Sequence, residues 1–336
     1  MSRGDLCILS VPVQVGKTTR LQAWVAEAQS KGQRFGGFLM PDNAVGQRML
    51  QPLSRGAFAQ PIEDPVAGDL SIGRFRFRTA AFQAALAALD AALEETADWV
   101  VVDEIGPLEI RKAQGLEPGF GPWLHRWRQQ MDRPNLLLVI RDFLLEEATK
   151  TYDLQGAKVN EGPWFAPDLA PIAGVLLAGG ESKRMAKPNL PHPAGGTWNS
   201  QAHDQLARHL PNVWISGGRA DAAQWAGHGP FSGILSAADA LPGHSLLVRC
   251  DDRPDLSDTA IAKLLSAHRL TGRSVCFRQG DQLDPLVAVY SARDLAWIRK
   301  AFETSGQDAL PHMLDPVVLP VHSRESLGLT RRSAAD

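Results

Sequence analysis

The sequence has few cysteines, almost no net charge and no long apolar run, and each shortage excludes a class of protein. Its three cysteines are scattered without a Cys-x-x-Cys pair, which argues against a disulfide scaffold or a cysteine zinc site. With 35 basic and 37 acidic side chains, no overall field favours nucleic acid or an anionic membrane. No apolar run approaches the roughly 20 residues that span a bilayer, and the N-terminal stretch MSRGDLCILS does not suit a secretory signal. We therefore expect a cytoplasmic protein.

The length and composition predict two domains, and the alternation of strands and helices described below predicts that both are α/β. At roughly 150 residues per domain, a chain of 336 residues corresponds to about two, and 44% apolar residues suffice for buried cores. The segment Thr151–Pro171 is rich in glycine, proline and aspartate, which is typical of a linker. We therefore place the boundary near residue 165, with domains over 1–160 and 168–336.

Short apolar strands alternate with helical periodicity in both halves, which favours parallel sheets covered by helices on both faces. The run Trp123–Arg128 is expected as an amphipathic helix that packs Trp123 and Trp127 inward. Strands are expected at Leu6–Ser10, Phe35–Met40, Ile72–Phe77, Trp99–Asp103, Leu136–Ile140, Ile172–Leu177, Val213–Ser216, Ser245–Cys250, Val275–Phe277 and Leu286–Tyr290. Further helices are expected at Thr18–Gln29, Ala80–Ala97, Ile234–Ala240 and Thr259–Leu270.

The first candidate site is the loop between the first expected strand and helix, where Gly16, Lys17, Thr18 and Thr19 follow one another. At such a turn, backbone N–H groups hold anionic oxygens, Lys17 reaches the terminal phosphates and the Thr18 hydroxyl holds Mg²⁺. The full pattern has glycine where this chain has Val11, so the loop takes another path or binds nucleotide more weakly. A helix start capped by Thr18 is the simpler alternative.

An acidic pair provides the partner that this loop needs. The apolar strand Trp99–Asp103 ends in a carboxylate and is followed by Glu104. In phosphate-loop enzymes, one carboxylate lies near the metal and a second orients the attacking water. An ordinary polar strand end is the alternative for this pair alone. Because the loop and the pair occur together, each in a suitable context, they favour a nucleotide site.

The first domain resembles the small nucleoside-triphosphatase family of the P-loop class. The shared residues are the GKTT loop, Gly37-Phe38 with Pro41, the run Gly46-Gln47-Arg48, and DEIGPLE from Asp103 to Glu109. The resemblance covers about residues 5–150 and implies a parallel P-loop sheet. It also implies that Gly16, Lys17, Thr18 and Thr19 bind phosphate, that Thr18 and Asp103 hold Mg²⁺, and that Glu104 is the base. The family has glycines where this chain has Val11 and Gln14.

The second candidate site follows a buried apolar strand, where the chain reads LLAGGESKRM over Leu176–Met185. The paired glycines, Gly179 and Gly180, let the backbone approach a nucleobase and phosphates without a Cβ in the way. Ser182 can bond phosphate oxygens, and the planar guanidinium of Arg184 suits a triphosphate. A glycine pair alone is a common turn, whereas the whole string is a specific signal for nucleotide binding.

The second domain resembles the MobA-like nucleotidyltransferases, which include molybdenum cofactor guanylyltransferase. Besides the glycine loop, the shared runs follow in family order: Gly229–Leu235, Asp252–Leu256, Asp284–Tyr290 and, faintly, Ser323–Leu327. The resemblance covers about residues 170–330 and implies a Rossmann-like nucleotidyltransferase sheet. It implies catalysis by Arg184, Asp252 and a lysine, with Mg²⁺ on Asp252. Nucleotide binding is implied for Leu177, Ala178, Gly179, Gly180, Ser182, Gly229, Pro230 and Gly233.

Two positions compete for the lysine of that family. The family reads R-M-G-x-D-K, whereas this chain reads RMAKPNLP over Arg184–Pro191. An alignment without gaps places Asn189 at the catalytic lysine, while a two-residue deletion places Lys187 there. We prefer Lys187, because flanking residues then match the family's K-P-L-L-P. The choice matters, since the loss of one preorganised positive group raises a barrier by about 3–4 kcal/mol.

The resemblances imply an enzyme of molybdenum cofactor maturation. It would transfer GMP, or CMP, from a nucleoside triphosphate to molybdopterin with release of pyrophosphate, and GTP is favoured over CTP or ATP. The first domain would be a coupled or regulatory NTPase, and molybdoenzymes or cofactor-maturation proteins would be partners, without nucleic acid or membrane. A second hypothesis is a nucleotide-binding adaptor or chaperone in which one or both catalytic sites have decayed. It rests on the departures from the family patterns at Val11 and Gln14 and on the choice between Lys187 and Asn189. A third is a protein in which only the first domain works, as a slow NTPase.

Overall fold

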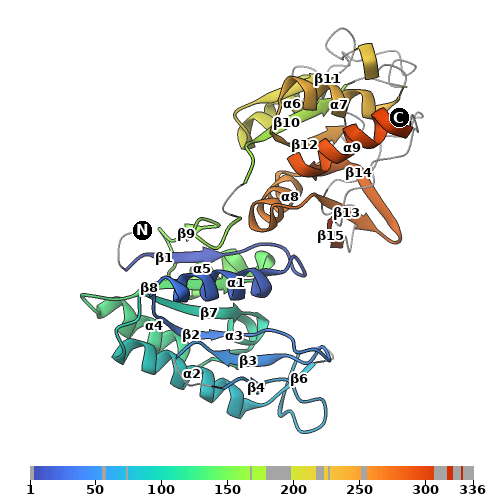
Figure 1. Ribbon diagram of the computed structural model, residues 1–336. Helices are drawn as coiled ribbons and strands as arrows, with labels where there is room; N and C mark the ends of the chain where they lie inside the picture. Colours follow the sequence, from blue (N-terminus) through green and yellow to red (C-terminus); the bar gives the residue numbers. More distant parts are fainter. Residues whose placement is uncertain are drawn as a thin grey trace. The chain divides into compact units, whose positions relative to one another are not determined.

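The chain folds into two compact units, each with its own sheet (Figure 1). A computed structural model describes residues 4–54, 58–72, 75–166, 169–178, 198–216, 223–225, 228–250, 256–305, 316–320 and Leu327. Unit 1 is Met1–Phe165 and unit 2 is Ala166–Asp336. Within the described ranges, no helix combines the length and the hydropathy needed to cross a membrane. The architecture is α/β in both units, as predicted.

Unit 1 is built on a seven-stranded sheet of order β4-β3-β2-β7-β8-β1-β9. Neighbours from β2 to β9 pair in parallel, whereas β3 and β4 extend one edge in antiparallel pairing. The central strands are apolar and buried on both faces, which is the pattern of a parallel sheet covered by helices. The strands are β1 (Leu6–Leu9), β2 (Phe35–Leu39), β3 (Met49–Pro52), β4 (Gln60–Pro61), β7 (Trp99–Ile105), β8 (Asn135–Ile140) and β9 (Lys158–Val159).

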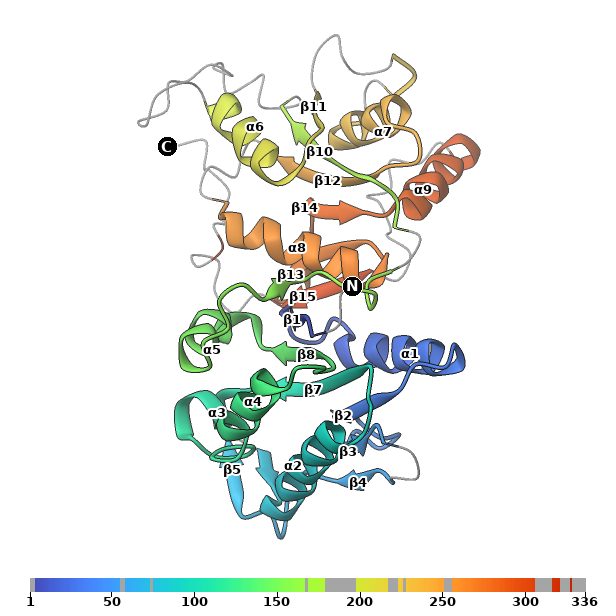
Figure 2. The same cartoon turned by 90° about the vertical axis from the view of Figure 1, so that its left-hand side faces the viewer.

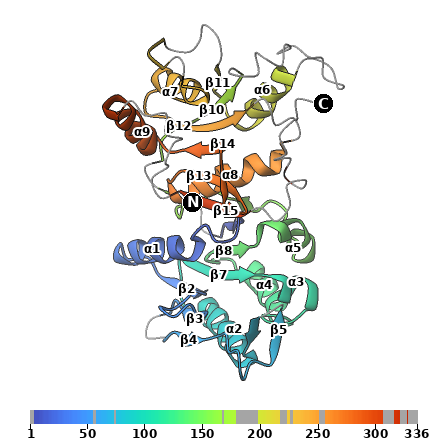
Figure 3. The ribbon, with the colours of Figure 1, turned by 90° about the vertical axis from the view of Figure 1, so that its right-hand side faces the viewer.

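Helices cover both faces of this sheet, with α1 on one side and α3, α4 and α5 on the other (Figures 2 and 3). Successive strand residues point to opposite faces, so Trp99 packs on Trp24 of α1, while Val100 lies in the core with α2 and α4. Trp123 and Trp127 are each 1% exposed, which confirms the inward-packing helix predicted there. The helices are α1 (Lys17–Ser30), α2 (Thr79–Glu94), α3 (Pro107–Lys112), α4 (Phe120–Gln129), the 3₁₀ turn η1 (Asp142–Leu144) and α5 (Leu145–Thr151).

The single strand predicted at Ile72–Phe77 is wrong. The structure has two short strands instead, β5 (Leu70–Ile72) and β6 (Phe75–Phe77), paired antiparallel in a sheet of their own. The apolar alternation changes phase between them, because Leu70 and Ile72 are at even positions whereas Phe75 and Phe77 are at odd ones. One continuous strand would have pointed these pairs to opposite faces.

Unit 2 has a six-stranded sheet of order β11-β10-β12-β14-β13-β15. β10, β11 and β12 are parallel, but β14 is antiparallel to both of its neighbours, so the prediction of a wholly parallel sheet is wrong at this strand. Only Gly280 and Asp281 connect β13 to β14, and so short a connection joins antiparallel neighbours. The strands are β10 (Ile172–Leu177), β11 (Val213–Ser216), β12 (Ser245–Cys250), β13 (Val275–Gln279), β14 (Gln282–Tyr290) and β15 (Val317–Pro320).

The helices of unit 2 also lie on both faces of its sheet. In the two turned views, α7 and α9 lie on one side and α6 and α8 on the other (Figures 2 and 3). Phe231 and Ile234 of α7 and Ile298 of α9 pack in one buried cluster with Val175 and Val248 of the sheet. The helices are α6 (Trp198–His209), the 3₁₀ turn η4 (Ala223–Trp225), α7 (Pro230–Ala240), α8 (Asp258–Thr271) and α9 (Ala292–Ser305).

Candidate nucleotide-binding sites

The loop that follows β1 ends in a helix start that suits an anion. Gly16 is the residue before α1 and has φ 83° and ψ 29°, a left-handed conformation that glycine adopts without strain. Within the described part of the chain, no side chain caps α1, so Thr18 does not act as the cap. The first backbone N–H groups of α1 therefore remain available to phosphate oxygens. Thr19 is exposed in the same first turn.

Lys17 lies across this loop. Its Nζ donates hydrogen bonds to the carbonyl oxygens of Val11 at 3.0 Å and Pro12 at 3.1 Å, and the residue is 8% exposed. Burial lowers the pKa of Lys17, while the charges of Glu104 and Asp103 act in the opposite direction. The ammonium group is thus held beside the helix start, where it interacts electrostatically with both carboxylates.

The strained residue of the loop is Gln14, not Val11. Val11 is fully buried and is not among the residues with positive φ, so its branched side chain fits the observed path. Gln14 has φ 61°, a left-handed conformation that side chains with a Cβ adopt at a cost. Of the two positions where glycine is replaced, the second therefore carries the strain.

Replacing Gln14 by glycine is expected to raise the free energy of unfolding by about 0.5–1 kcal/mol, because glycine relieves the left-handed strain but loses more chain entropy on folding. Urea unfolding of the full chain measures the change. The matched control is Ala23→Gly on the exposed face of α1, which should lower the same quantity by about 1 kcal/mol. A decrease for both variants would contradict strain at Gln14.

Asp103 and Thr18, the two residues predicted to hold Mg²⁺, are hydrogen-bonded to each other. Thr18 Oγ1 donates to Asp103 Oδ2 at 2.9 Å, and the backbone N–H of Met40 donates to the same oxygen at 3.2 Å. Burial, and then the charge of Glu104, raise the pKa of Asp103, whereas these two hydrogen bonds lower it. A hydroxyl and a carboxylate are hard oxygen ligands, and Mg²⁺ is often held by one or two such groups together with phosphate oxygens. The donor set therefore fits Mg²⁺.

The described residues include no alternative metal cluster. Among them, no group of three or more histidine, cysteine or acidic side chains is placed to hold a metal ion. A Thr18–Asp103 site for Mg²⁺ would take its remaining ligands from water and from the nucleotide, as is usual for this ion. Mg²⁺ bound there would neutralise charge on the phosphates.

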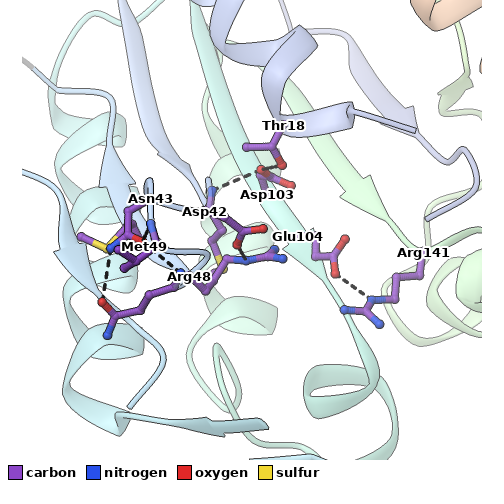
Figure 4. Close-up of polar contacts among 11 residues, drawn as sticks. Thr18, Asp42, Asn43, Arg48, Met49, Asp103, Glu104 and Arg141 are labelled. Carbon is purple, nitrogen blue, oxygen red and sulfur yellow. Dashed lines mark hydrogen bonds and ion pairs between the residues drawn. The ribbon is translucent and has the colours of Figure 1, made fainter. Parts of the chain in front are cut away.

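In Figure 4, the loop between β2 and β3 lies on the side of Asp103 away from Arg141. Its side chains bond mainly to one another: Arg48 Nε donates to Asp42 Oδ1 at 2.7 Å, and the backbone N–H of Gln47 donates to Asn43 Oδ1 at 3.0 Å. The N–H of Met40, at the start of this loop, is the group that binds Asp103. The run Gly46-Gln47-Arg48, on which the family resemblance partly rests, is therefore part of the same loop as the N–H that binds Asp103.

Glu104 is paired with an arginine that was not among the residues predicted from sequence. Arg141 Nε donates to Glu104 Oε1 at 2.7 Å, and the two side chains are 37% and 16% exposed. In Figure 4, Glu104 lies between the Thr18–Asp103 pair and Arg141. Arg141 directly follows β8, just as Glu104 lies near the end of β7. A charged residue immediately after a buried apolar strand was the signal that could have identified it.

Glu109 braces the chain just after this acidic pair. Its Oε2 accepts from the N–H of Gly106 at 2.9 Å, and its Oε1 accepts from the N–H of Leu116 at 3.1 Å. The residue is 5% exposed, and burial raises its pKa to about 7 against the ordinary 4.5, although these N–H groups act to lower it. Glu109 therefore positions the segment that begins α3.

The free energy of unfolding is expected to fall as pH rises from about 4.5 to about 7, because folded Glu109 keeps a proton that the unfolded chain has released. The pKa difference corresponds to at most about 3 kcal/mol. Glu109→Gln should flatten this slope, whereas the exposed control Glu95→Gln should retain it. Urea unfolding at several pH values measures both slopes. Equal slopes in the two variants would exclude Glu109 as the titrating group.

The second site is described only at the strand ends that lead into it. β10 and β12 are parallel neighbours, and Leu177 pairs with Cys250 at their carboxyl ends. The N–H of Ala178 donates to the carbonyl of Ser216 at 3.0 Å, which ties the end of β10 to β11. The residues predicted to carry the chemistry, Gly179, Gly180, Ser182, Arg184, Lys187 or Asn189, and Asp252, lie outside the described residues, so their roles stay predictions.

The start of α7 lies against these strand ends. Gly229, with φ 59°, precedes the helix, and Pro230 is its first residue. A Cβ at Gly233 would come within 2.1 Å of Ser216 Oγ and 2.8 Å of Leu177 Cδ2, so only glycine allows this approach. Of the predicted nucleotide-binding residues, Leu177 and Gly233 are therefore in close proximity.

Two protein families match the chain. Residues 174–317 match the MobA-like NTP transferase domain. Residues 7–118 match a family described as NTPase. The two matches fall in different units, and the structure divides the chain between them, after Phe165.

Similar curated proteins carry names from molybdenum cofactor biosynthesis. The chain is 30% identical over 149 residues to the molybdenum cofactor biosynthesis bifunctional protein of Synechocystis sp., which covers 39% of this chain and 42% of that protein. It thus spans less than half of that relative. Over 166 residues it is 30% identical to the probable molybdenum cofactor guanylyltransferase of Rhodopirellula baltica, covering 42% of this chain and 77% of that one. For the protein of the same name from Mycobacterium tuberculosis, identity is 33% over 150 residues, covering 44% and 65%.

Solved structures similar to the chain include two kinds of protein. One is THEP1 from Aquifex aeolicus, with a TM-score of 0.36, 18% identity, and coverage of 46% of this chain and 87% of that one. Another is molybdopterin-guanine dinucleotide biosynthesis protein A from Archaeoglobus fulgidus, with a TM-score of 0.34 and 16% identity. That match covers 48% of this chain and 91% of the other.

Proposed function

Because the chain belongs to the MobA-like NTP transferase family, we propose that unit 2 transfers a nucleoside monophosphate to a molybdopterin-type acceptor. GMP is the preferred group and GTP the preferred donor, since the Rhodopirellula baltica and Mycobacterium tuberculosis relatives are named guanylyltransferases. An oxygen of the acceptor's phosphate attacks the α-phosphorus of the triphosphate. A new P–O bond forms, the bond to the β-phosphate oxygen breaks, and pyrophosphate leaves.

The observation that carries this proposal is the register of β10 and β12. Leu177 pairs with Cys250. In the sequence, the glycine pair follows shortly after Leu177, and Asp252 follows shortly after Cys250. Open α/β sheets bind ligands at the carboxyl ends of their parallel strands. The register therefore supports one site that receives the glycine turn from β10 and a carboxylate from β12.

In this proposal, the residues of the glycine turn bind the nucleotide and two charged groups act on the phosphates. Arg184 and Lys187 stabilise charge on the departing pyrophosphate, because preorganised positive groups bind the transition state more strongly than the ground state. Asp252 holds Mg²⁺. Asn189 takes the place of Lys187 if the chain aligns with its family without a gap.

Release of pyrophosphate tests the transfer reaction. The full chain is given molybdopterin, Mg²⁺ and GTP, CTP or ATP in turn, and release is expected with GTP. Asp252→Ala should abolish it, whereas Asp258→Ala, at the exposed start of α8, should leave it unchanged. Comparing Lys187→Ala with Asn189→Ala identifies the catalytic position. No pyrophosphate with any of the three triphosphates would overturn the proposal.

We further propose that unit 1 binds a nucleoside triphosphate and hydrolyses it slowly, as a module coupled to the transfer. The Thr18–Asp103 hydrogen bond beside Lys17, with Glu104 next in the chain, favours this second activity. Water attacks the terminal phosphorus, Glu104 accepts its proton, and the nucleoside diphosphate leaves. Calorimetry together with phosphate release separates this activity from the adaptor hypothesis, in which nucleotide binds without turnover. Molybdoenzymes or cofactor-maturation proteins in the cytoplasm are the partners that this proposal includes.

A further inference from the structure

Arg141 offers an anion a free edge of its guanidinium. The hydrogen bond to Glu104 comes from Nε. Among the described residues, neither terminal nitrogen of Arg141 donates a hydrogen bond to the protein. Because a guanidinium is planar and presents its donors in a fixed fork, the edge formed by the two terminal nitrogens suits two oxygens of one phosphate. One side chain can therefore hold a carboxylate and a phosphate together.

Strand order brings Arg141 to the same edge of the sheet as the phosphate loop. Arg141 follows β8, which pairs with β7 on one side and β1 on the other. β7 carries Asp103 and Glu104, and β1 leads into the loop of Lys17. The charges of Glu104 and Arg141 both act on the pKa of Lys17, one raising it and the other lowering it. The three side chains therefore share one electrostatic environment.

Charge at this site favours a cation at Glu104 in addition to Lys17 and the proposed Mg²⁺. Glu104 and Asp103 are consecutive acidic residues, and a triphosphate at the helix start would bring several more negative charges close to them. A carboxylate that faces a terminal phosphate repels it unless a positive group lies between them. Lys17 Nζ bonds to the loop carbonyls and not to Glu104, whereas Arg141 contacts this carboxylate directly.

We propose that Arg141 binds the terminal phosphate of the triphosphate in unit 1 while its Nε holds Glu104 in place to accept the proton of water. This inference rests on the proposed nucleotide site of unit 1. It assigns Arg141 two roles, as a catalytic residue that touches the terminal phosphate and as the residue that positions the base. A nucleoside diphosphate lacks the group that Arg141 recognises, so the side chain distinguishes triphosphate from diphosphate.

The test compares a triphosphate analogue with a diphosphate on the full chain. Calorimetry measures the binding of guanylyl imidodiphosphate and of GDP, each with Mg²⁺. The binding that disappears in Lys17→Ala is assigned to the site in unit 1. In Arg141→Ala, the affinity of the unit 1 site for the analogue should fall at least about tenfold. Its affinity for GDP should stay within about twofold of wild type. Phosphate release from GTP should fall by about a hundredfold, and added guanidinium should restore part of it. Arg141→Lys should recover less than guanidinium, because it keeps the charge without the fork.

The matched control is Arg111→Ala. Arg111 is an arginine of the same unit, half exposed and paired with Glu147 at 2.6 Å, so its loss should change none of these quantities. Thermal melting of each variant confirms folding. The role of Arg141 would be wrong if Arg141→Ala weakened the binding of analogue and GDP equally. It would also be wrong if Arg141→Ala weakened neither while Lys17→Ala weakened both. Either result would still support the nucleotide site of unit 1. If Lys17→Ala also leaves binding and hydrolysis unchanged, the nucleotide site of unit 1 is wrong and the inference falls with it.

Discussion

Phosphate release by unit 1 should fall by about a hundredfold or more when Lys17 is replaced by alanine, which is the usual effect of removing one preorganised donor. The ammonium group lies at the helix start and is held there by the carbonyls of Val11 and Pro12 at 3.0 and 3.1 Å. Alanine removes both the charge that meets the phosphates in the proposed site and the bridge across the loop. A malachite green assay with GTP or ATP and Mg²⁺ measures the release.

The control for this experiment is Lys31→Ala. Lys31 follows the other end of α1, is 68% exposed at its side chain and pairs with Glu27. Its removal changes the same net charge without touching the loop, so release should match wild type. Pyrophosphate release by unit 2 should survive Lys17→Ala, since unit 2 has its own proposed site. Hydrolysis that persists at the wild-type rate in Lys17→Ala would show that the loop after β1 is not the hydrolytic site.

Truncation of Trp164 to alanine should lower the free energy of unfolding of unit 1 by about 3–5 kcal/mol, the range for a fully buried aromatic side chain. The indole is 0% exposed, with ring centroids 5.3 Å from Trp24 and 5.8 Å from Trp99 in edge-on contacts. Such contacts add to the effect of burying the rings. Alanine would leave a cavity on the face of the sheet that α1 covers, and the rigid neighbours cannot fill it.

Urea unfolding, followed by far-ultraviolet circular dichroism because the variant loses a fluorophore, measures this loss. Phe58→Ala is the control, since Phe58 is an aromatic residue of the same unit that is 88% exposed; its loss should be within about 0.5 kcal/mol. Arg20 donates to the carbonyls of Trp164 and Phe165, both at 2.7 Å, so the backbone stays anchored when the ring is removed. Similar small losses in both variants would contradict a packing role for Trp164.

Sequence patterns identified most elements because their physical cause is local. The strands β11 and β12 have the predicted bounds, since each is an apolar run that ends at polar residues. The loop of Lys17 and the carboxylate of Asp103 were paired from sequence alone. Their contact follows from strand order, because a loop after one parallel strand and a carboxylate near the end of another meet at one edge of the sheet. The 2.9 Å hydrogen bond from Thr18 to Asp103 agrees with that inference.

Contacts between distant parts of the chain decided the rest. The place of Arg141 after an apolar strand can be seen in the sequence, but no local pattern indicates that its side chain bonds to Glu104. The same holds for the hydrogen bond that Glu109 accepts from the N–H of Leu116. The left-handed strain falls on Gln14 and not on Val11 because the path of the loop depends on what packs around it.

The family, the α/β class and the glycine-bearing loop of Lys17 could be predicted from the sequence, because these depend on residue identity and short-range periodicity. The second glycine-bearing loop lies outside the described residues and stays a prediction. The tertiary structure was needed to show which charged side chains pair and which strand of unit 2 is antiparallel. It was also needed to show that Gln14, and not Val11, is the strained residue where the family has glycine. Residues far apart in the chain come into contact only when the backbone folds, so the local periodicity of the sequence does not reveal these interactions.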